Sequence, residues 1–256
     1  MKSMVIAAPN GARRGKHSHP NLPLTIDEIA AEAAACQHAG AAVLHLHVRD
    51  TNGVHSLDAG LYRAATVAIA ESAPGMLVQI TTESAGLFEL SAQIACVEAV
   101  RPEAVSVAWR EFAPEENTTA RRFYSWAKAE GIHVQHILYS VEDILRFRDY
   151  GLRDTSVLLV LGQYRGIEAQ EAELPTYLSA LGKVRDWCVC AFGRAEHAVV
   201  SAAIAHGGHA RVGFENNLWL KDGKLANGTH ELVAQIQADV MDSSEVRKLW
   251  ELKTDG

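Results

Sequence analysis

Ala41-Ala42-Val43-Leu44-His45-Leu46-His47-Val48-Arg49 is the most informative stretch of this sequence, because an apolar run leads there into two histidines at positions i and i+2. Successive side chains of a β-strand point to opposite faces, so His45 and His47 are predicted to point the same way. Two imidazoles on one face near a strand end are candidate transition-metal ligands, although an isolated pair is more often hydrogen-bonded without a metal. A third ligand has to come from elsewhere in the chain.

Apolar runs alternate with helical patterns along all 256 residues. The predicted strands are 4–8, 41–49, 77–82, 104–109, 132–139, 155–161, 187–192 and 209–214. Eight strand–helix units without a linker predict a (β/α)8 TIM barrel. A doubly wound open sheet is the alternative, but it usually has fewer strands, and no Gly-x-Gly-x-x-Gly follows the first strand.

We expect one domain over residues 1–256. A long polar loop at 10–24 follows the first strand, and Thr25 and Glu28 form a capping box that predicts a helix from there to His38. The last helix is predicted at 229–241, and a short charged tail at 242–256 follows it.

The composition of the chain limits the kinds of molecule that it is expected to bind. The net charge is -7 and no Lys/Arg cluster occurs, which argues against nucleic acid and anionic membranes but leaves anionic small molecules open. No apolar run approaches the ~20 residues of a membrane span and no signal region precedes the first strand, so we expect a cytoplasmic protein. The four cysteines, at 36, 96, 188 and 190, are expected to pack in the core rather than to form disulfides, and the Cys-x-Cys pair could also hold metal.

Polar residues fall at the predicted C-terminal ends of strands, where TIM barrels carry their chemistry. They are Asn10 and Arg13 after the first strand, Thr81 and Glu83 on the third, Ser106 on the fourth, and Arg211, Glu215 and Asn216 on the eighth. Arg211, Gly213 and Glu215 are expected to share the inner face of the eighth strand. Some of these residues also have a simpler explanation. Arg211 and Glu215 could form a structural ion pair, and Glu83 and Arg13 could be solvated loop residues.

His45, His47 and Glu215 together form a His₂Glu set, which leaves coordination positions open as catalytic metal sites do. Zn²⁺ is the default, although residue type does not separate it from Mn²⁺, Fe²⁺, Co²⁺ or Ni²⁺. Such a metal acts as a Lewis acid on a carbonyl oxygen, and Arg211 beside it could clamp a carboxylate.

Four segments resemble the β-keto acid cleavage enzymes, the family of the 3-keto-5-aminohexanoate cleavage enzyme: 7–12 (AAPNGA), 19–25 (HPNLPLT), 39–49 (AGAAVLHLHVR) and 207–217 (GGHARVGFENN). Members are zinc-dependent TIM barrels, usually homotetramers. They condense a β-keto acid with acetyl-CoA and release acetoacetate and a new acyl-CoA by a retro-Claisen cleavage. The resemblance implies the same fold, metal, co-substrate and assembly here.

The resemblance also implies roles for individual residues. The family's zinc ligands fall on His45, His47 and Glu215, and its catalytic arginine falls on Arg211. A serine on the third strand and a threonine on the fourth correspond to Thr81 and Ser106, which both keep a hydroxyl group.

Two positions depart from the family pattern. An aspartate that works with the arginine is replaced by Asn216, and an amide cannot accept a substrate proton. Glu83, two residues after Thr81 on the same strand face, is our candidate base instead. Arg13 replaces the glutamate that holds the substrate's amino group, and a cation repels an ammonium. With Arg13 and Asn10 as substrate-binding residues, we expect a β-keto acid that is uncharged elsewhere or carries a second carboxylate, rather than 3-keto-5-aminohexanoate.

The leading prediction is therefore an acetyl-CoA-dependent acyltransferase that cleaves a C–C bond. A metal-dependent aldolase or hydrolase that needs no CoA is the alternative enzyme. A barrel that binds metal or ligand without turnover is the non-enzymatic alternative. Dependence on CoA separates the two enzymes.

Overall fold

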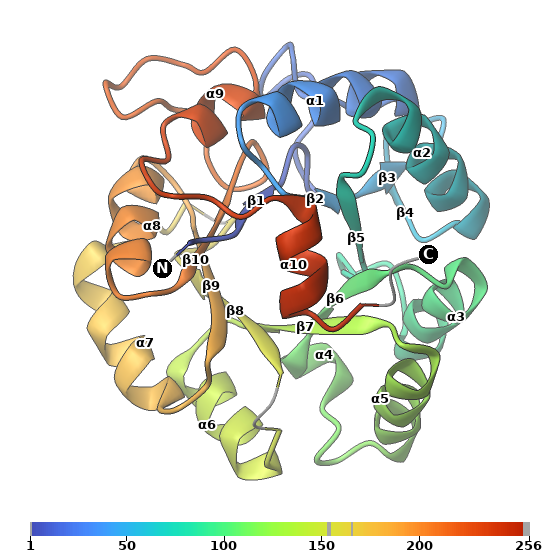
Figure 1. Ribbon diagram of the computed structural model, residues 1–256. Coiled ribbons are helices and arrows are strands. Elements are labelled where there is room, and N and C mark those ends of the chain that lie inside the picture. Colours follow the sequence, from blue (N-terminus) through green and yellow to red (C-terminus); the bar gives the residue numbers. More distant parts are fainter. Residues whose placement is uncertain (1, 153–154, 165, 253–256) are drawn as a thin grey trace.

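Eight parallel strands close into a barrel in the computed structural model, which describes residues 2–152, 155–164 and 166–252. The strands are β1 (Val5–Ala7), β2 (Val43–Leu46), β5 (Leu77–Thr81), β6 (Ala104–Ala108), β7 (His133–Leu138), β8 (Ser156–Leu161), β9 (Asp186–Ala191) and β10 (His209–Val212). Their order is β1-β10-β9-β8-β7-β6-β5-β2, and β1 closes the ring by pairing with both β2 and β10 (Figure 1). The predicted TIM barrel is confirmed and the open sheet is excluded.

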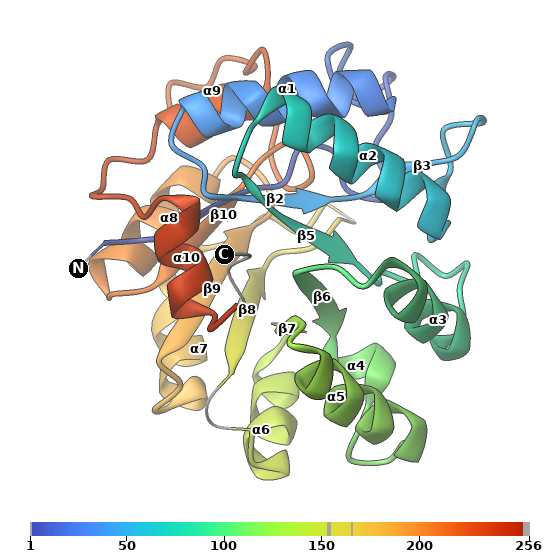
Figure 2. The same cartoon turned by 45° about the vertical axis from the view of Figure 1, so that its right-hand side comes forward.

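Helices surround the barrel (Figures 1 and 2). They are α1 (Ile26–His38), α2 (Ala59–Ser72), α3 (Leu90–Val100), α4 (Trp109–Phe112), α5 (Thr118–Glu130), α6 (Val141–Tyr150), α7 (Leu174–Leu181) after the 3₁₀ turn η1 (Glu171–Glu173), α8 (Glu196–Ala205), α9 (Thr229–Ala234) and α10 (Ser243–Leu249). The predicted capping box opens α1, since the Glu28 amide donates to Thr25 Oγ1 (3.2 Å) and the Thr25 amide to Glu28 Oε2 (3.1 Å). Among the helices described, none combines the length and the apolar character needed to span a membrane.

The apolar strands and the cysteines lie in the core of the barrel. β8 is buried along its whole length, as expected of a strand covered on both faces. All four cysteines are free and buried, and Cys188 and Cys190 belong to a core cluster with residues of other barrel strands. The expectation of core packing without disulfides is therefore confirmed.

Several predicted strands end earlier than expected, and two of them, β2 and β6, are followed closely by other elements. β2 stops at Leu46, and the chain continues as the short strand β3 (Val48–Arg49), which pairs antiparallel with β4 (His55–Ser56). β6 stops at Ala108, because Trp109 begins the helical turn α4 with its indole fully buried.

The eighth barrel strand ends at Val212 rather than at Phe214. Gly213 has a φ of +146°, a conformation that favours glycine, and a Cβ there would overlap the carbonyl oxygen of Ala8. Glu215 therefore lies in the turn after the strand, and the prediction that it shares a strand face with Arg211 is wrong.

The C-terminal part of the chain completes the barrel. α9 is shorter than the predicted helix 229–241, because the backbone around Val240 leaves it to pair with Ser3. The segment predicted as a charged tail contains α10, which lies across the N-terminal end of the barrel (Figure 1). Trp250 donates to Asp186 Oδ2 (3.0 Å) and stacks on His133, with ring centroids 4.1 Å apart. The opposite, C-terminal end of the barrel carries the loops around the site.

The loop 10–24 is fixed to this end by two arginines that sequence analysis did not identify. Arg49 is buried and donates to the backbone carbonyl of Ala12 (2.6 Å). Arg14 donates to the carbonyl of Phe214 in the turn after β10 (2.8 Å). Such charge-assisted hydrogen bonds are among the stronger ones in proteins, so the loop has a defined position over the barrel.

Trp250→Ala is expected to lower the free energy of unfolding by about 3–5 kcal/mol, because a buried aromatic ring and its hydrogen bond are lost. Leu249→Ala, at an adjacent side chain that is 39% exposed, is the control and should change stability by less than about 1 kcal/mol. Urea denaturation measures both. Equal stability of the two variants would show that α10 is not part of the cooperative core.

Candidate active site and metal centre

The three residues predicted as metal ligands lie together at the C-terminal end of the barrel. His45 Nε2 and His47 Nε2 are 3.1 Å apart, and Glu215 Oε2 lies 3.5 Å from the first and 3.6 Å from the second. All three side chains are buried. Ligand atoms about 2.0–2.1 Å from a tetrahedral zinc ion are about 3.3 Å from one another, close to these separations.

A chain of hydrogen bonds through the barrel sets the tautomer of His45. Its Nδ1 lies 2.9 Å from Gln79 Oε1, Gln79 Nε2 donates to Gln135 Oε1 (3.2 Å), and Gln135 Nε2 donates to Ser156 Oγ (3.2 Å). Because Gln79 presents its oxygen, His45 carries its proton on Nδ1, and the lone pair of Nε2 faces His47. Burial lowers the pKa of His45 to about 4, so the imidazole is neutral at pH 7.

The two carboxylate oxygens of Glu215 have different surroundings. Oε1 accepts hydrogen bonds from Arg211 Nη2 and from the Tyr164 hydroxyl, both at 3.2 Å. Oε2 is buried and accepts no hydrogen bond from the residues described. Burial raises the pKa of Glu215, but Arg211 and His45 outweigh it, so the net pKa is lowered and the group is ionised. Burial also lowers the pKa of His47, so this anionic oxygen lies beside two neutral imidazoles, a set that fits a divalent cation.

A buried carboxyl group supports the turn that carries Glu215. Glu196 accepts hydrogen bonds from the Gly213 amide (3.2 Å) and from Asn217 Nδ2 (3.1 Å). Burial raises its pKa to about 8. The Glu215 amide donates to the carbonyl of Ala8 at the end of β1 (3.1 Å). The turn after β10 is thus bound to both neighbouring parts of the barrel.

A small inner cavity opens beside these residues. Its lining comprises His45, Thr81, Glu83, Ala108, Ile137, Tyr139, Val160, Tyr164, Phe192, Arg211 and Glu215. Thr81 Oγ1 accepts from the Glu83 amide (3.0 Å), which leaves the hydroxyl proton available to a ligand. Nε and Nη1 of Arg211 are buried and have no partner among the residues described. Burial, and then the negative charge of Glu215, raise the pKa of Glu83 to about 7.

Besides His47 of the candidate metal centre and Arg13, three predicted site residues lie outside this lining, and their roles stay predictions. Ser106 is buried opposite Thr81 in the β5–β6 pairing, and its hydroxyl has no partner in the described part of the chain. Asn10 donates to the carbonyl of His47 (3.0 Å), so it holds the backbone at that histidine. Asn216 is fully buried, and neither Oδ1 nor Nδ2 of its side chain has a hydrogen-bond partner within the described ranges.

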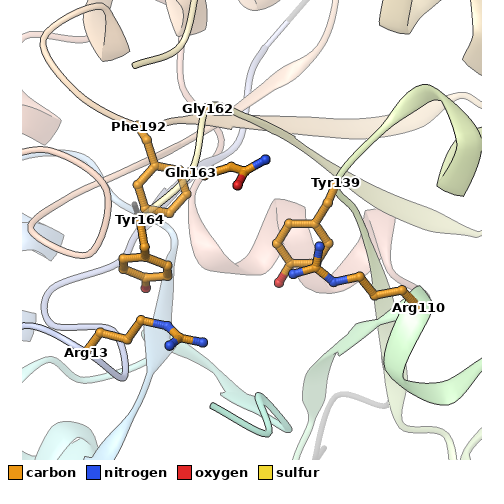
Figure 3. A pocket seen from close by; sticks show the side chains of 7 residues that line it. All are labelled: Arg13, Arg110, Tyr139, Gly162, Gln163, Tyr164 and Phe192. Atoms are coloured by element: carbon orange, nitrogen blue, oxygen red, sulfur yellow. The ribbon is translucent and has the colours of Figure 1, made fainter. Parts of the chain in front are cut away.

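A larger outer cavity of about 270 Å³ lies next to the inner one. Its lining comprises Arg13, Arg110, Tyr139, Gly162, Gln163, Tyr164 and Phe192 (Figure 3). Arg13 Nε lies 3.4 Å from Glu83 Oε1, so the predicted substrate-binding arginine and the candidate base are in contact.

Several residues that build this site were not among those predicted from the sequence. Tyr164 follows β8, so the rule that chemistry sits at strand ends could have identified it. Gln79 interrupts the apolar β5, and a polar residue inside an apolar strand was a signal that we did not use. Glu196 lies on α8 and gave no signal, because its partners belong to a distant turn.

The chain is similar to known proteins in sequence and in fold. A family model described as beta-keto acid cleavage enzyme matches residues 2–249. The 3-keto-5-aminohexanoate cleavage enzyme of Fusobacterium nucleatum subsp. nucleatum is 28% identical over 248 residues, covering 92% of this chain and 90% of that enzyme. The 3,5-dioxohexanoate:acetyl-CoA acetone transferase of Paraburkholderia graminis is 23% identical, covering 98% and 96%. A solved structure of ObcA with oxaloacetate has a TM-score of 0.68 at 17% identity, covers 92% of this chain and 68% of that one, and shows the fold.

Gly11→Ala is expected to weaken binding of a divalent metal by about 10- to 100-fold, the effect typical of disturbing a ligand's support. A Cβ at Gly11 would lie 2.5 Å from Glu215 Cγ and 2.8 Å from the Tyr164 hydroxyl oxygen. Gly53→Ala is the matched control, since Gly53 also has a positive φ (+76° against +61°) but nothing within 4 Å of its Cβ position. Titration of the metal-free proteins with Zn²⁺ measures the affinities. Equal affinity in the two variants would contradict the role of this contact.

Proposed function

The chain belongs to the beta-keto acid cleavage enzyme family, and we propose that it condenses a β-keto acid with acetyl-CoA to give acetoacetate and a new acyl-CoA. One observation of the site supports the proposal. A buried oxygen of Glu215 faces two neutral imidazoles, and neither this oxygen nor the nearby Nε and Nη1 of Arg211 has a hydrogen-bond partner in the part of the chain that the structure describes. The name of the Paraburkholderia graminis relative, an acetyl-CoA acetone transferase, supports the choice of acetyl-CoA as co-substrate.

We propose that His45, His47 and Glu215 hold a zinc ion, for which the separations and the protonation states of these groups are suited. When bound, the cation supplies Lewis-acid polarisation of the keto group, which makes the neighbouring C2 carbon more acidic. The homotetramer expected from the family resemblance and the single domain over residues 1–256 also remain proposals.

The side chains around the inner cavity can bind the substrate carboxylate, stabilise the negative charge that develops during the reaction, and transfer the C2 proton. Glu83 removes a proton from C2 of the keto acid, and the nitrogens of Arg211 bind the substrate carboxylate. Thr81 donates a hydrogen bond to the oxygen on which negative charge develops. Ser106 is proposed to act in the same way.

The bonds in the reaction balance without a further reactant. The C2 carbon forms a bond to the acetyl carbonyl carbon, and the CoA thiolate leaves. The thiolate then attacks the original keto carbon, and the bond between that carbon and C2 breaks. The acyl group stays on CoA, and acetoacetate takes back the proton that C2 had lost.

Incubation of the zinc-loaded protein with a panel of β-keto acids and acetyl-CoA is expected to produce acetoacetate and a CoA ester, detected by mass spectrometry. His47→Ala should lose both the metal and the activity. Product formation without acetyl-CoA would support an aldolase or hydrolase instead. Bound zinc without turnover of any keto acid would support a binding protein.

Glu83→Gln is expected to lower kcat by about 10²-fold or more, because the amide cannot accept the C2 proton. In the wild type, kcat/KM should rise with pH through an inflection near 7 or below, since the base works only when deprotonated and a bound cation lowers its pKa further. The variant should lose this rise.

Glu111→Gln is the control for this experiment. Glu111 accepts a hydrogen bond from the hydroxyl of Ser84, the residue after Glu83, but does not line the inner cavity, so turnover of the variant should stay within a few-fold of the wild type. An unchanged rate and pH profile in Glu83→Gln would assign the base elsewhere.

A further inference from the structure

The outer cavity adjoins the reacting end of the site. Tyr139, Tyr164 and Phe192 line both cavities, so the two are separated by no more than these shared side chains. A substrate whose keto acid end lies at the inner cavity therefore extends its other end into the outer one. The residues there are in a position to select substrates by that distal end.

The outer cavity is lined by two cations. Arg13 and Arg110 reach into it from opposite sides (Figure 3). The guanidinium carbon of Arg110 lies 3.7 Å from the centroid of the Tyr139 ring, and across the described residues no carboxylate oxygen lies within 4.0 Å of its nitrogens. Stacking on an aromatic face occupies the plane of a guanidinium and leaves its N–H edge for a ligand.

Arg13 is only partly engaged. Its contact with Glu83 is made through Nε, and its side chain is half exposed. The guanidinium carbon lies 5.3 Å from the Tyr164 ring centroid. The terminal nitrogens point into the cavity opposite Arg110 (Figure 3). Two guanidinium groups facing one small cavity match a carboxylate, which accepts hydrogen bonds on two oxygens.

We propose that the outer cavity binds the second carboxylate of a β-keto dicarboxylic acid between Arg13 and Arg110, with Arg110 as the residue that determines this specificity. The inference rests on the proposed function and names its substrate class. It selects the dicarboxylate from the two classes that Arg13 alone allows, because an uncharged substrate would leave Arg110 without an anionic partner among the described residues and Arg13 with only its Nε contact to Glu83.

A phosphate group of acetyl-CoA is the other anion to consider. In acetyl-CoA the whole pantetheine arm separates the phosphates from the thioester that reacts at the inner cavity. Arg13 and Arg110 lie only one layer of side chains from that cavity. A substrate carboxylate reaches them at this distance, whereas the phosphates extend past them.

The test compares two keto acids of equal chain length, 3-oxohexanedioate and 3-oxohexanoate, with acetyl-CoA as the second substrate. The wild type is expected to favour the dicarboxylate in kcat/KM by about 10- to 100-fold, the range for hydrogen bonds between charged groups. Arg110→Gln should bring this ratio close to one, because the KM for the dicarboxylate rises while the KM for 3-oxohexanoate does not change. Arg122→Gln, at an exposed arginine of α5 outside both cavities, should keep the wild-type ratio.

Each other outcome has a defined meaning. Equal use of both acids by the wild type would overturn the inference while the proposed function stands. A rise in KM for acetyl-CoA alone in Arg110→Gln would assign the arginine to a CoA phosphate. Calorimetric titration of the wild type with 3-oxohexanedioate, without acetyl-CoA, keeps the inference testable if neither acid turns over: binding that Arg110→Gln weakens supports it, and absence of binding refutes it.

Discussion

The carboxylate of Glu215 is the group on which the rest of the site depends, because it is buried and still ionised. An unpaired buried charge is strongly destabilising, so each oxygen needs a partner. Arg211 and Tyr164 satisfy Oε1, and this leaves Oε2 directed at the two imidazoles. The ion pair with Arg211 therefore does more than stabilise the barrel. It keeps the carboxylate charged, so that the oxygen facing the histidines can act as a metal ligand.

The closed barrel is what brings these groups together from opposite ends of the chain. β1 pairs with β2 on one side and β10 on the other, so the histidines and Glu215 flank a single strand. The turn after β1 has to fit between the histidines and Glu215. It carries a glycine at position 11, because the side chain of any larger residue would overlap that of Glu215. Asn10 and Arg49 fix the same region by hydrogen bonds to the backbone. The strand pairings that close the barrel therefore also bring the residues of the site together.

Much of this arrangement could be predicted from the sequence, since apolar runs and helix caps are local signals. The eight strands followed from such runs, and His45 and His47 from their spacing at the end of one of them. The bend at Gly213 could not be predicted, because it depends on the carbonyl of Ala8, which is distant in sequence. The same holds for Glu196, whose partners are placed by tertiary structure. Local patterns gave the strands, whereas long-range contacts determine where the side chains after the strands point.

Net charge gives a misleading impression of the field that a substrate meets. The chain carries -7 overall, yet Arg13, Arg110 and Arg211 line the two cavities against Glu83 and Glu215. Arg13 also lowers the pKa of Glu83, in opposition to burial and to Glu215. A carboxylate bound between the arginines shares Arg13 with Glu83 and adds negative charge nearby, and both effects raise the pKa of Glu83. A bound dicarboxylate would therefore have two opposing effects on Glu83: the deprotonated carboxylate would accept a carbon-bound proton more readily, but a smaller fraction of it would be deprotonated near neutral pH.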